Sequence, residues 1–153
     1  RRTTTDRLNA QQRRTPGKAA AEGLEQQQLA ALDAALDVWD DVSLADLRAR
    51  SIVLTQAFIA GVEASCPAVT LNSPRDPARR GSQVSFRHPQ GYAVMQALIA
   101  AGVVGDFRAP DVLRFGFAPL YNDLDDVGRA VDTLARILRD GSWDDEGFGK
   151  GLP

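Results

Sequence analysis

The first recognisable pattern along the chain is an apolar residue at every third or fourth position, which predicts helices. The first such stripe consists of Leu29, Leu32, Leu36 and Trp39. Ser43, three residues before Asp46, is typical of a helix N-cap and predicts the start of a second helix. The apolar stripe of this second helix consists of Leu47, Leu54, Phe58 and Val62. It is expected to run to about residue 64.

The middle of the chain combines short strand patterns with one further helix. The expected strands are at 69–71, 82–86, 103–107 and 112–117. Between the second and third strands, Pro89 suits the first turn of a helix and Gly102 suits its C-terminal cap. The buried stripe of that helix is expected to consist of Tyr92, Met95 and Ile99.

A last helix follows the strands, with Asn122 or Asp123 as its cap and Gly141 at its end. Its inward seam is expected to consist of Leu124, Val127, Val131, Leu134 and Leu138. The complete order is helix, helix, strand, strand, helix, strand, strand, helix. This order predicts a small α+β (α/β) domain in which helices pack on one face of a small mixed or antiparallel sheet.

The strand expected at 112–117 carries an arginine inside an apolar run. Because side chains alternate along a strand, Arg114 and Gly116 share one face, whereas Phe115 and Phe117 share the other. The glycine leaves space for a ligand, and a planar, permanently charged guanidinium suggests a carboxylate or a phosphate. The alternatives are a surface arginine on an edge strand and one half of a structural ion pair, and spacing alone does not decide among them.

The opposite strand is expected to place Gln83 and Ser85 on the same face as Arg114. A sheet face with so few large apolar groups must be solvated or covered by something else. A domain that is missing from this chain is one candidate for that cover.

Composition indicates an ordinary globular domain, because 44% of the 153 residues are hydrophobic and 25% are charged. The net charge of −2 gives no sign of a nucleic-acid or anionic-membrane partner. No apolar run approaches the roughly 20 residues that a membrane helix needs. Cys66 is the only cysteine, so no internal disulfide can form, and a reducing cytoplasmic compartment is expected.

The two ends of the chain differ from its middle. Residues 1–28 contain six basic and three acidic residues but few large apolar ones, so we expect a disordered or non-native tail. A nucleic-acid-binding arm is the less favoured reading of this segment. Residues 29–140 form the expected domain, and residues 141–153 are expected to be a flexible tail. Arg1 in place of an initiator methionine suggests a fragment or a processed product.

Few residues offer catalytic chemistry. His88 and Cys66 are each the only member of their type, and neither belongs to a motif with metal-ligand spacing. Lys18 and Lys150 are the only lysines, and both lie in polar or glycine-rich terminal segments. We therefore expect no catalytic, cofactor-binding or metal-binding residue in this chain.

Five stretches carry a family resemblance: residues 36–39, 47–55, 80–86, 102–108 and 114–122. The most specific are Arg-Gly-Ser-Gln at 80–83 and Arg-Phe-Gly-Phe-x-Pro-Leu-Tyr at 114–121. With them, residues 29–140 resemble the C-terminal part of kynureninase, a pyridoxal-phosphate enzyme of the aspartate-aminotransferase fold type (fold type I). The resemblance implies that Arg114 binds the α-carboxylate of an amino-acid substrate. It also implies hydrolysis of L-kynurenine to anthranilate and L-alanine, a step of tryptophan catabolism.

The resemblance covers only part of such an enzyme. It implies that the Schiff-base lysine and the phosphate cradle lie upstream, in a larger domain, and that the complete enzyme is a homodimer. The isolated chain is then catalytically incomplete. Two alternatives stay open: a non-catalytic binding or interaction module, and the small domain of another fold-type I enzyme such as a cysteine desulfurase. The choice between kynurenine and 3-hydroxykynurenine also stays open.

Overall fold

The computed structural model describes residues 16–144 and 147–148, and these separate into two units after Val42. The first unit contains helix α2 (Pro16–Leu36) and a short 3-10 turn, Asp37–Trp39. The helix starts well before Leu29 because the preceding residues are mainly alanine, glutamine and glutamate, which favour helix. Residues 16–28 of the expected tail are therefore helical, and residues 1–15 lie outside the described part.

The second unit begins at Ser43 and contains the remaining helices and strands. In chain order these are α3 (Leu44–Ser65), β1 (Thr70–Leu71), β2 (Gln83–Arg87), α4 (Gly91–Ala100), β3 (Asp106–Arg108), β4 (Val112–Gly116) and α5 (Leu124–Asp140). This order confirms the predicted succession of helices and strands. None of the helices in the described residues is long and apolar enough to cross a membrane.

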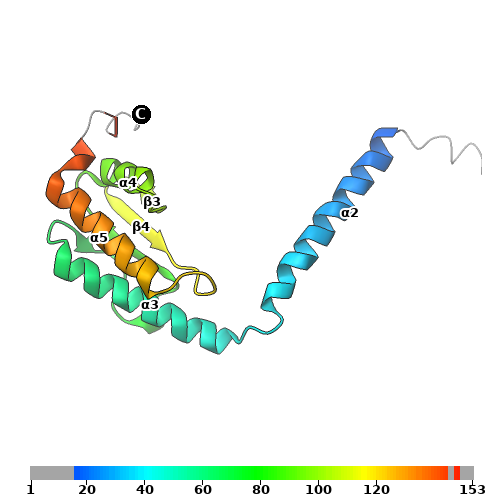
Figure 1. Cartoon of the computed structure of the whole chain (residues 1–153), viewed down its shortest axis with the longest axis horizontal. Coiled ribbons are helices and arrows are strands. Elements are labelled where there is room, and N and C mark those ends of the chain that lie inside the picture. The colour runs from blue at the N-terminus through cyan, green and yellow to red at the C-terminus, as the bar shows by residue number, and fades with distance from the viewer. Residues whose placement is uncertain (1–15, 145–146, 149–153) are drawn as a thin grey trace, which may run out of the picture. The chain divides into compact units, whose positions relative to one another are not determined.

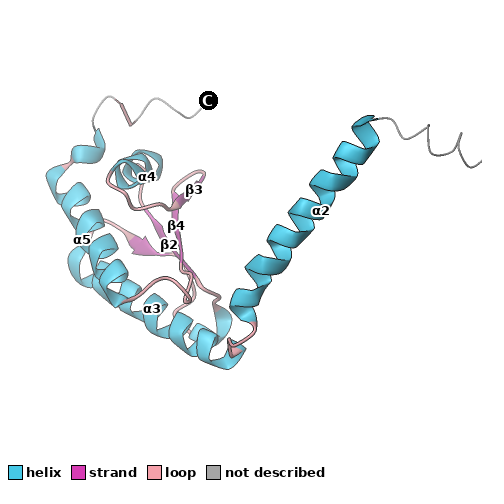
Figure 2. Ribbon diagram, turned by 45° about the vertical axis from the view of Figure 1, so that its right-hand side comes forward, coloured by secondary structure: helices cyan, strands magenta, loops and turns pink. Residues whose placement is uncertain are grey.

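The four strands form one antiparallel sheet with the order β1-β2-β4-β3. Figures 1 and 2 show α3 and α5 side by side against the strands, with α4 near one end of the sheet. Buried residues from α3, α4, α5, β2 and β4 form a single core cluster between the helices and the sheet. The predicted α+β domain with helices on one face of the sheet is confirmed.

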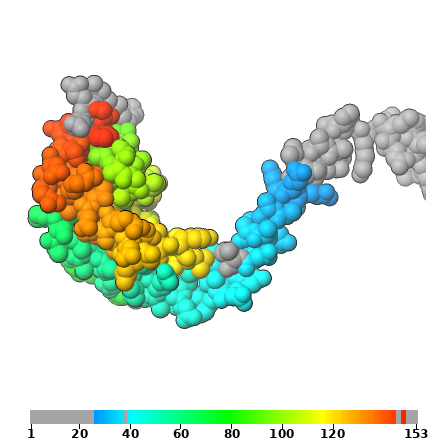
Figure 3. All heavy atoms as spheres, in the orientation of Figure 1, coloured from blue at the N-terminus to red at the C-terminus, as the bar shows by residue number. Residues whose placement is uncertain are grey.

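Helices α3 and α5 approach each other closely. A Cβ atom at Gly61 of α3 would lie 2.9 Å from a methyl carbon of Val131 in α5, so only glycine fits this contact without a shift. In the space-filling view α5 lies across the surface between α3 and α4 (Figure 3). The helical layer over the sheet is therefore tightly packed.

The centre of the core is a group of aromatic rings around Phe58 of α3. Its ring centroid lies 4.9 Å from that of Phe115 in β4 and 6.0 Å from that of Phe86 in β2. The ring of Phe117, just after β4, is 5.2 Å away. One side chain of α3 therefore anchors both central strands, at geometries that aromatic pairs prefer.

Two predicted helix faces were partly wrong. In α4 the buried residues include Val94, Met95 and Leu98, whereas Ile99 is 41% exposed and Tyr92 is only half-buried. Almost every residue of α4 is apolar, so periodicity does not define its inward face. In α5 the first seam residue, Leu124, is exposed, and Ile137 is buried in the core.

Most helix ends follow the predicted signals, but α4 begins at Gly91, so Pro89 precedes the helix and does not lie in its first turn as predicted. The side chain of Ser43 accepts a hydrogen bond from the Asp46 N–H (3.3 Å), and Asp123 caps α5 in a reciprocal capping box with Asp126. Gly141 follows α5 with a φ of 68°, in the left-handed region that favours glycine. Asn122 is not the cap; its side-chain oxygen instead accepts a hydrogen bond from the Ala118 N–H (2.8 Å).

The described residues beyond α5 contribute to the core. Ser142–Asp144 form a 3-10 turn, and Trp143 and Phe148 are partly buried against the hydrophobic cluster. The ring of Trp143 also packs edge-on against His88, with centroids 5.7 Å apart. Residues 145–146 and 149–153 of the expected tail lie outside the described part.

Gly105 occupies a site where a side chain has no room. A Cβ atom there would lie 2.7 Å from the Met95 methyl carbon and 2.9 Å from the Arg114 carbonyl oxygen. We expect Gly105→Ala to lower the free energy of unfolding by about 1–3 kcal/mol, as measured by urea denaturation. Gly116→Ala is the matched control, because a Cβ at Gly116 meets no atom within 4 Å. Equal losses in the two variants would contradict this explanation.

His88 is expected to make stability depend on pH. The residue is 8% exposed, and its Nδ1 accepts a hydrogen bond from the Gln90 N–H (3.1 Å), which requires a neutral ring. Burial lowers the pKa of His88 below its usual value. Its contribution is therefore present above the unfolded-state pKa of about 6.5 and is lost as the pH falls towards the folded-state pKa.

The measurement is urea unfolding between about pH 7.5 and about pH 5. We expect the free energy of unfolding to fall across this range in the unmodified chain, and His88→Gln to flatten the fall. A slope that the substitution leaves unchanged would assign the pH dependence to other groups.

Candidate functional site

Arg114 lies in β4 on the sheet face that points away from the helices. Its neighbours in the chain, Leu113 and Phe115, are buried in the core, which confirms the predicted alternation. Across the sheet, Arg114 stands opposite Ser85 of β2 on one side and Asp106 of β3 on the other. Its side chain is 31% exposed, so the guanidinium remains accessible.

Arg114 forms an ion pair with Asp106. Its Nε donates a hydrogen bond to Oδ2 of Asp106 at 3.0 Å, and its Nη2 also donates to the same oxygen. Arg108 contacts this oxygen as well, with its Nη2 at 3.1 Å. The hydrogen bonds from Arg114 lower the pKa of Asp106, with the charges of Arg108 and Arg114 acting in the same direction. Asp106 is therefore ionised at neutral pH.

Open space lies beside Arg114 on the side of Gly116. A Cβ at Gly116 would meet no atom within 4 Å, and Gln83, its partner across the sheet, is exposed. Ser85, in contrast, is only 7% exposed, and its hydroxyl lies 3.0 Å from that of Ser73. The predicted space next to the arginine is present, and it opens towards the end of β4.

Arg80, the first residue of the motif at 80–83, is buried, although charged residues in polar loops are usually exposed. Arg80 is 7% exposed and donates hydrogen bonds to the carbonyl oxygens of Pro74 (2.6 Å) and Arg75 (3.0 Å). Its Nη2 also donates to Oγ1 of Thr55 in α3 (3.2 Å). Burial lowers the pKa of Arg80, and the neighbouring charge of Arg48 adds to this effect.

Arg48 of α3 also binds the loop at 72–80, which contains Arg80. The sequence analysis did not identify this role of Arg48. Its Nη2 donates to the carbonyl oxygens of Arg80 (2.9 Å) and Pro77. The hydroxyl groups of Ser51 and Ser82 lie 2.6 Å apart and join α3 to the start of β2. The loop at 72–80 is therefore held to α3 by the guanidinium groups of Arg48 and Arg80 and by the exposed ion pair between Arg75 and Glu63.

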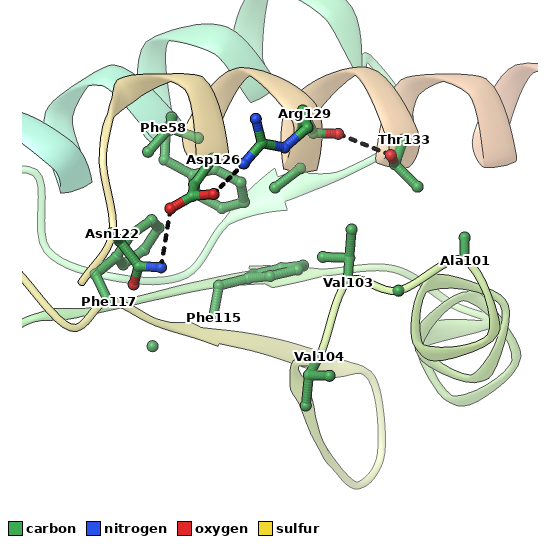
Figure 4. Close-up of a pocket in the computed structure, with 14 residues that line it drawn as sticks. Phe58, Ala101, Val103, Val104, Phe115, Phe117, Asn122, Asp126, Arg129 and Thr133 are labelled. Atoms are coloured by element: carbon green, nitrogen blue, oxygen red, sulfur yellow. Dashed lines mark hydrogen bonds and ion pairs between the residues drawn. The ribbon is translucent and has the colours of Figure 1, made fainter.

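A pocket of about 400 Å³ lies between β4, α5 and the loop that follows α4 (Figure 4). Phe115 and Val103 supply apolar walls, and the polar groups come from α5 and from Asn122 just before it. These polar groups bind one another: Asp126 accepts a hydrogen bond from Asn122 (3.3 Å) and pairs with Arg129. Arg114 is not among the residues that line the pocket, which opens on the helix-covered side of β4. Gly116, which borders the open space beside Arg114, does line the pocket, so the pocket reaches the edge of the candidate carboxylate site without including the guanidinium.

The other reactive residues considered in the sequence are Cys66 and the two lysines. Cys66 is 1% exposed, and burial raises the pKa of its thiol, which keeps it protonated and weakly nucleophilic. Lys18 lies in α2, and Lys150 lies outside the described residues. The sequence of the second unit from Ser43 to Asp144 contains no lysine.

The fold and this site define a small α+β domain that offers an arginine on an open, polar sheet face. Comparison with known proteins gives its family. Residues 47–134, more than half of the chain, match the model of the kynureninase C-terminal domain. The chain belongs to this family, and the match includes Arg114 and Asp106.

Similarity to individual proteins agrees with the family match. The chain is 50% identical to the kynureninase of Pseudomonas fluorescens over 117 residues, which cover 75% of this chain and 28% of the relative. It is 54% identical to the kynureninase of Deinococcus radiodurans over 112 residues, which cover 72% of this chain and 27% of the relative. The chain thus spans little more than a quarter of the length of these relatives.

Proposed function

We propose that this chain acts as the C-terminal domain of a kynureninase-like hydrolase, which cleaves L-kynurenine to anthranilate and L-alanine, and that Arg114 binds the substrate α-carboxylate. The observation that carries the proposal is the position of Arg114: it lies within the matched region and on the open sheet face, beside the space at Gly116. The family match favours this function over the small domain of a cysteine desulfurase.

The proposed role of Arg114 is to bind and orient. A guanidinium pairs with a carboxylate through two parallel hydrogen bonds, which fix the plane of the carboxylate as well as its position. When the carboxylate is fixed, the neighbouring Cα–H bond has a defined direction for proton removal. Arg114 supplies this geometry without taking a proton itself, because a guanidinium stays charged at physiological pH.

Pyridoxal phosphate would supply the electron sink for such a reaction. The second unit does not fit this group, because its sequence from Ser43 to Asp144 offers no lysine for the covalent attachment. We therefore assign cofactor binding to the part of the enzyme that the relatives have and this chain does not cover. The same part, as a larger domain, would cover the open face around Arg114.

Two further proposals concern the complete protein. We infer that it is a cytoplasmic homodimer, since the single cysteine favours a reducing compartment and the family resemblance implies a second subunit at the site. An interaction module without catalysis is the alternative. The exposed apolar residues of α2, among them Leu29 and Leu32, give that alternative some support.

One test of this proposal concerns the cofactor. The purified chain, mixed with pyridoxal phosphate and reduced with borohydride, should show no stoichiometric adduct by intact mass. The reason is that the sequence of the second unit from Ser43 to Asp144 contains no lysine. A specific adduct at Lys18 or Lys150, lost in the corresponding Lys→Ala variant, would show that the chain carries its own cofactor site.

A second test concerns Arg114 in an active enzyme. Residues 43–140 would replace the matching segment of the Pseudomonas fluorescens kynureninase, which is 50% identical over the aligned region. In this chimera Arg114→Ala should lower kcat/KM for L-kynurenine by about 100-fold, equivalent to about 2.7 kcal/mol, mainly through KM. Arg114→Lys keeps the positive charge but lacks the planar guanidinium. Its kcat/KM should lie between the values of the unmodified chimera and of Arg114→Ala. An unchanged kcat/KM in Arg114→Ala would rule out the carboxylate role.

A further inference from the structure

The contact between Arg114 and Asp106 uses only one side of the guanidinium. A guanidinium offers two edges that can each form paired hydrogen bonds, one through Nε and Nη2 and the other through Nη1 and Nη2. Asp106 accepts from Nε and Nη2, the first edge. Among the described residues, Nη1 of Arg114 has no hydrogen-bond partner. The second edge can therefore receive a carboxylate while Asp106 remains in place.

The backbone fixes Asp106 in this position. Asp106 stands directly opposite Arg114 in the β3–β4 ladder, so the two Cα atoms are cross-strand neighbours. The residue before it, Gly105, lies so close to Met95 and to the Arg114 carbonyl that no side chain fits. The start of β3 is thus held tightly against β4, which keeps the backbone of Asp106 beside the arginine.

Charge balance favours the same arrangement. Arg108 and Arg114 both contact Oδ2 of Asp106, so two positive groups share one negative group. The cluster keeps one net positive charge, which a single substrate carboxylate would neutralise. Without Asp106, two adjacent guanidinium groups would repel each other and Arg114 would lose its fixed orientation.

We propose that Asp106 is a positioning residue, which holds Arg114 by its Nε–Nη2 edge and thereby presents the Nη1–Nη2 edge to the α-carboxylate of the substrate. This inference rests on the proposed role of Arg114. It differs from a competing arrangement in which Asp106 merely occupies the arginine until the substrate displaces it. The two arrangements predict opposite changes in substrate affinity when Asp106 is removed.

The experiment uses the chimera with the Pseudomonas fluorescens enzyme. Asp106→Ala should raise KM for L-kynurenine about tenfold, with a smaller change in kcat, because the guanidinium loses its orientation. Asp106→Asn, which retains an acceptor oxygen, should recover part of the loss. A lowered KM in Asp106→Ala would show that Asp106 competes with the substrate, and an unchanged KM would show that it has no role; either result overturns the proposal.

The matched control is the other arginine–aspartate pair on this face. Arg87 of β2 contacts Asp111 at 3.0 Å, and both side chains are partly exposed, as in the Arg114 pair. Asp111→Ala should leave KM unchanged. If it raises KM as much as Asp106→Ala does, the effect belongs to the sheet as a whole and the proposal fails.

A substrate analogue separates positioning from general damage to the site. Decarboxylated kynurenine, which lacks only the α-carboxylate, should inhibit the unmodified and Asp106→Ala chimeras equally. If Asp106→Ala weakens the binding of this amine as much as the binding of L-kynurenine, the proposal is overturned. The double variant Asp106→Ala/Arg114→Ala should be no worse than Arg114→Ala alone, because Asp106 acts through Arg114.

The outcomes distinguish this inference from the proposed function. If Arg114→Ala leaves kcat/KM unchanged, the proposed carboxylate site is wrong. If Arg114→Ala impairs the chimera but Asp106→Ala does not, only the positioning role is wrong. Should the chimera be inactive, ¹⁵N NMR of the full chain gives a direct test. The Arg114 Nε–H should exchange with water faster in Asp106→Ala but not in Asp111→Ala, and equal rates in all three chains would overturn the proposal.

Discussion

The contact between Phe115 and Phe58 is the constraint on which the candidate site depends. It places one face of β4 in the core, and the alternation of side chains then directs Arg114 to the opposite face. A shift of β4 by one residue would bury the guanidinium among aromatic rings and expose two phenylalanines to water. The packing energy of the core therefore holds the arginine outward, with no contribution needed from a ligand.

Much of the fold could be predicted because the informative patterns are local. Strand β4 alternates clearly, and Ser43, Asp123 and Gly141 carry their helix signals within a few residues. The inward face of α4 could not be predicted, since a helix that is apolar on nearly all sides has no preferred face until its neighbours are in place. The burial of Arg80 was missed for a related reason: its partners are carbonyl groups brought near by the path of the loop.

Only part of the candidate site could be predicted from the sequence. Alternation, together with the family resemblance, singled out Arg114 and the space beside Gly116. Asp106 was not found, because its position opposite Arg114 depends on the register between β3 and β4, which no local pattern specifies. The two readings of Arg114, as half of an ion pair and as a ligand-binding group, also do not exclude each other once the two edges of the guanidinium are considered separately.

The loop at 72–80, held by Arg48 and Arg80, and the ion pair between Arg114 and Asp106 should respond differently when the pH falls. The bonds made by Arg48 and Arg80 join guanidinium groups to backbone carbonyls and a hydroxyl, none of which takes up a proton in the acidic range. Only the exposed ion pair between Arg75 and Glu63, among the described attachments of this loop to α3, involves a carboxylate. The link between Arg114 and Asp106 depends instead on a carboxylate, and it weakens when the pH falls through the lowered pKa of Asp106. Acidification would therefore release the orientation of Arg114 while the loop beside β2 stays attached. The attachment of this loop is therefore less sensitive to acid than the orientation of Arg114.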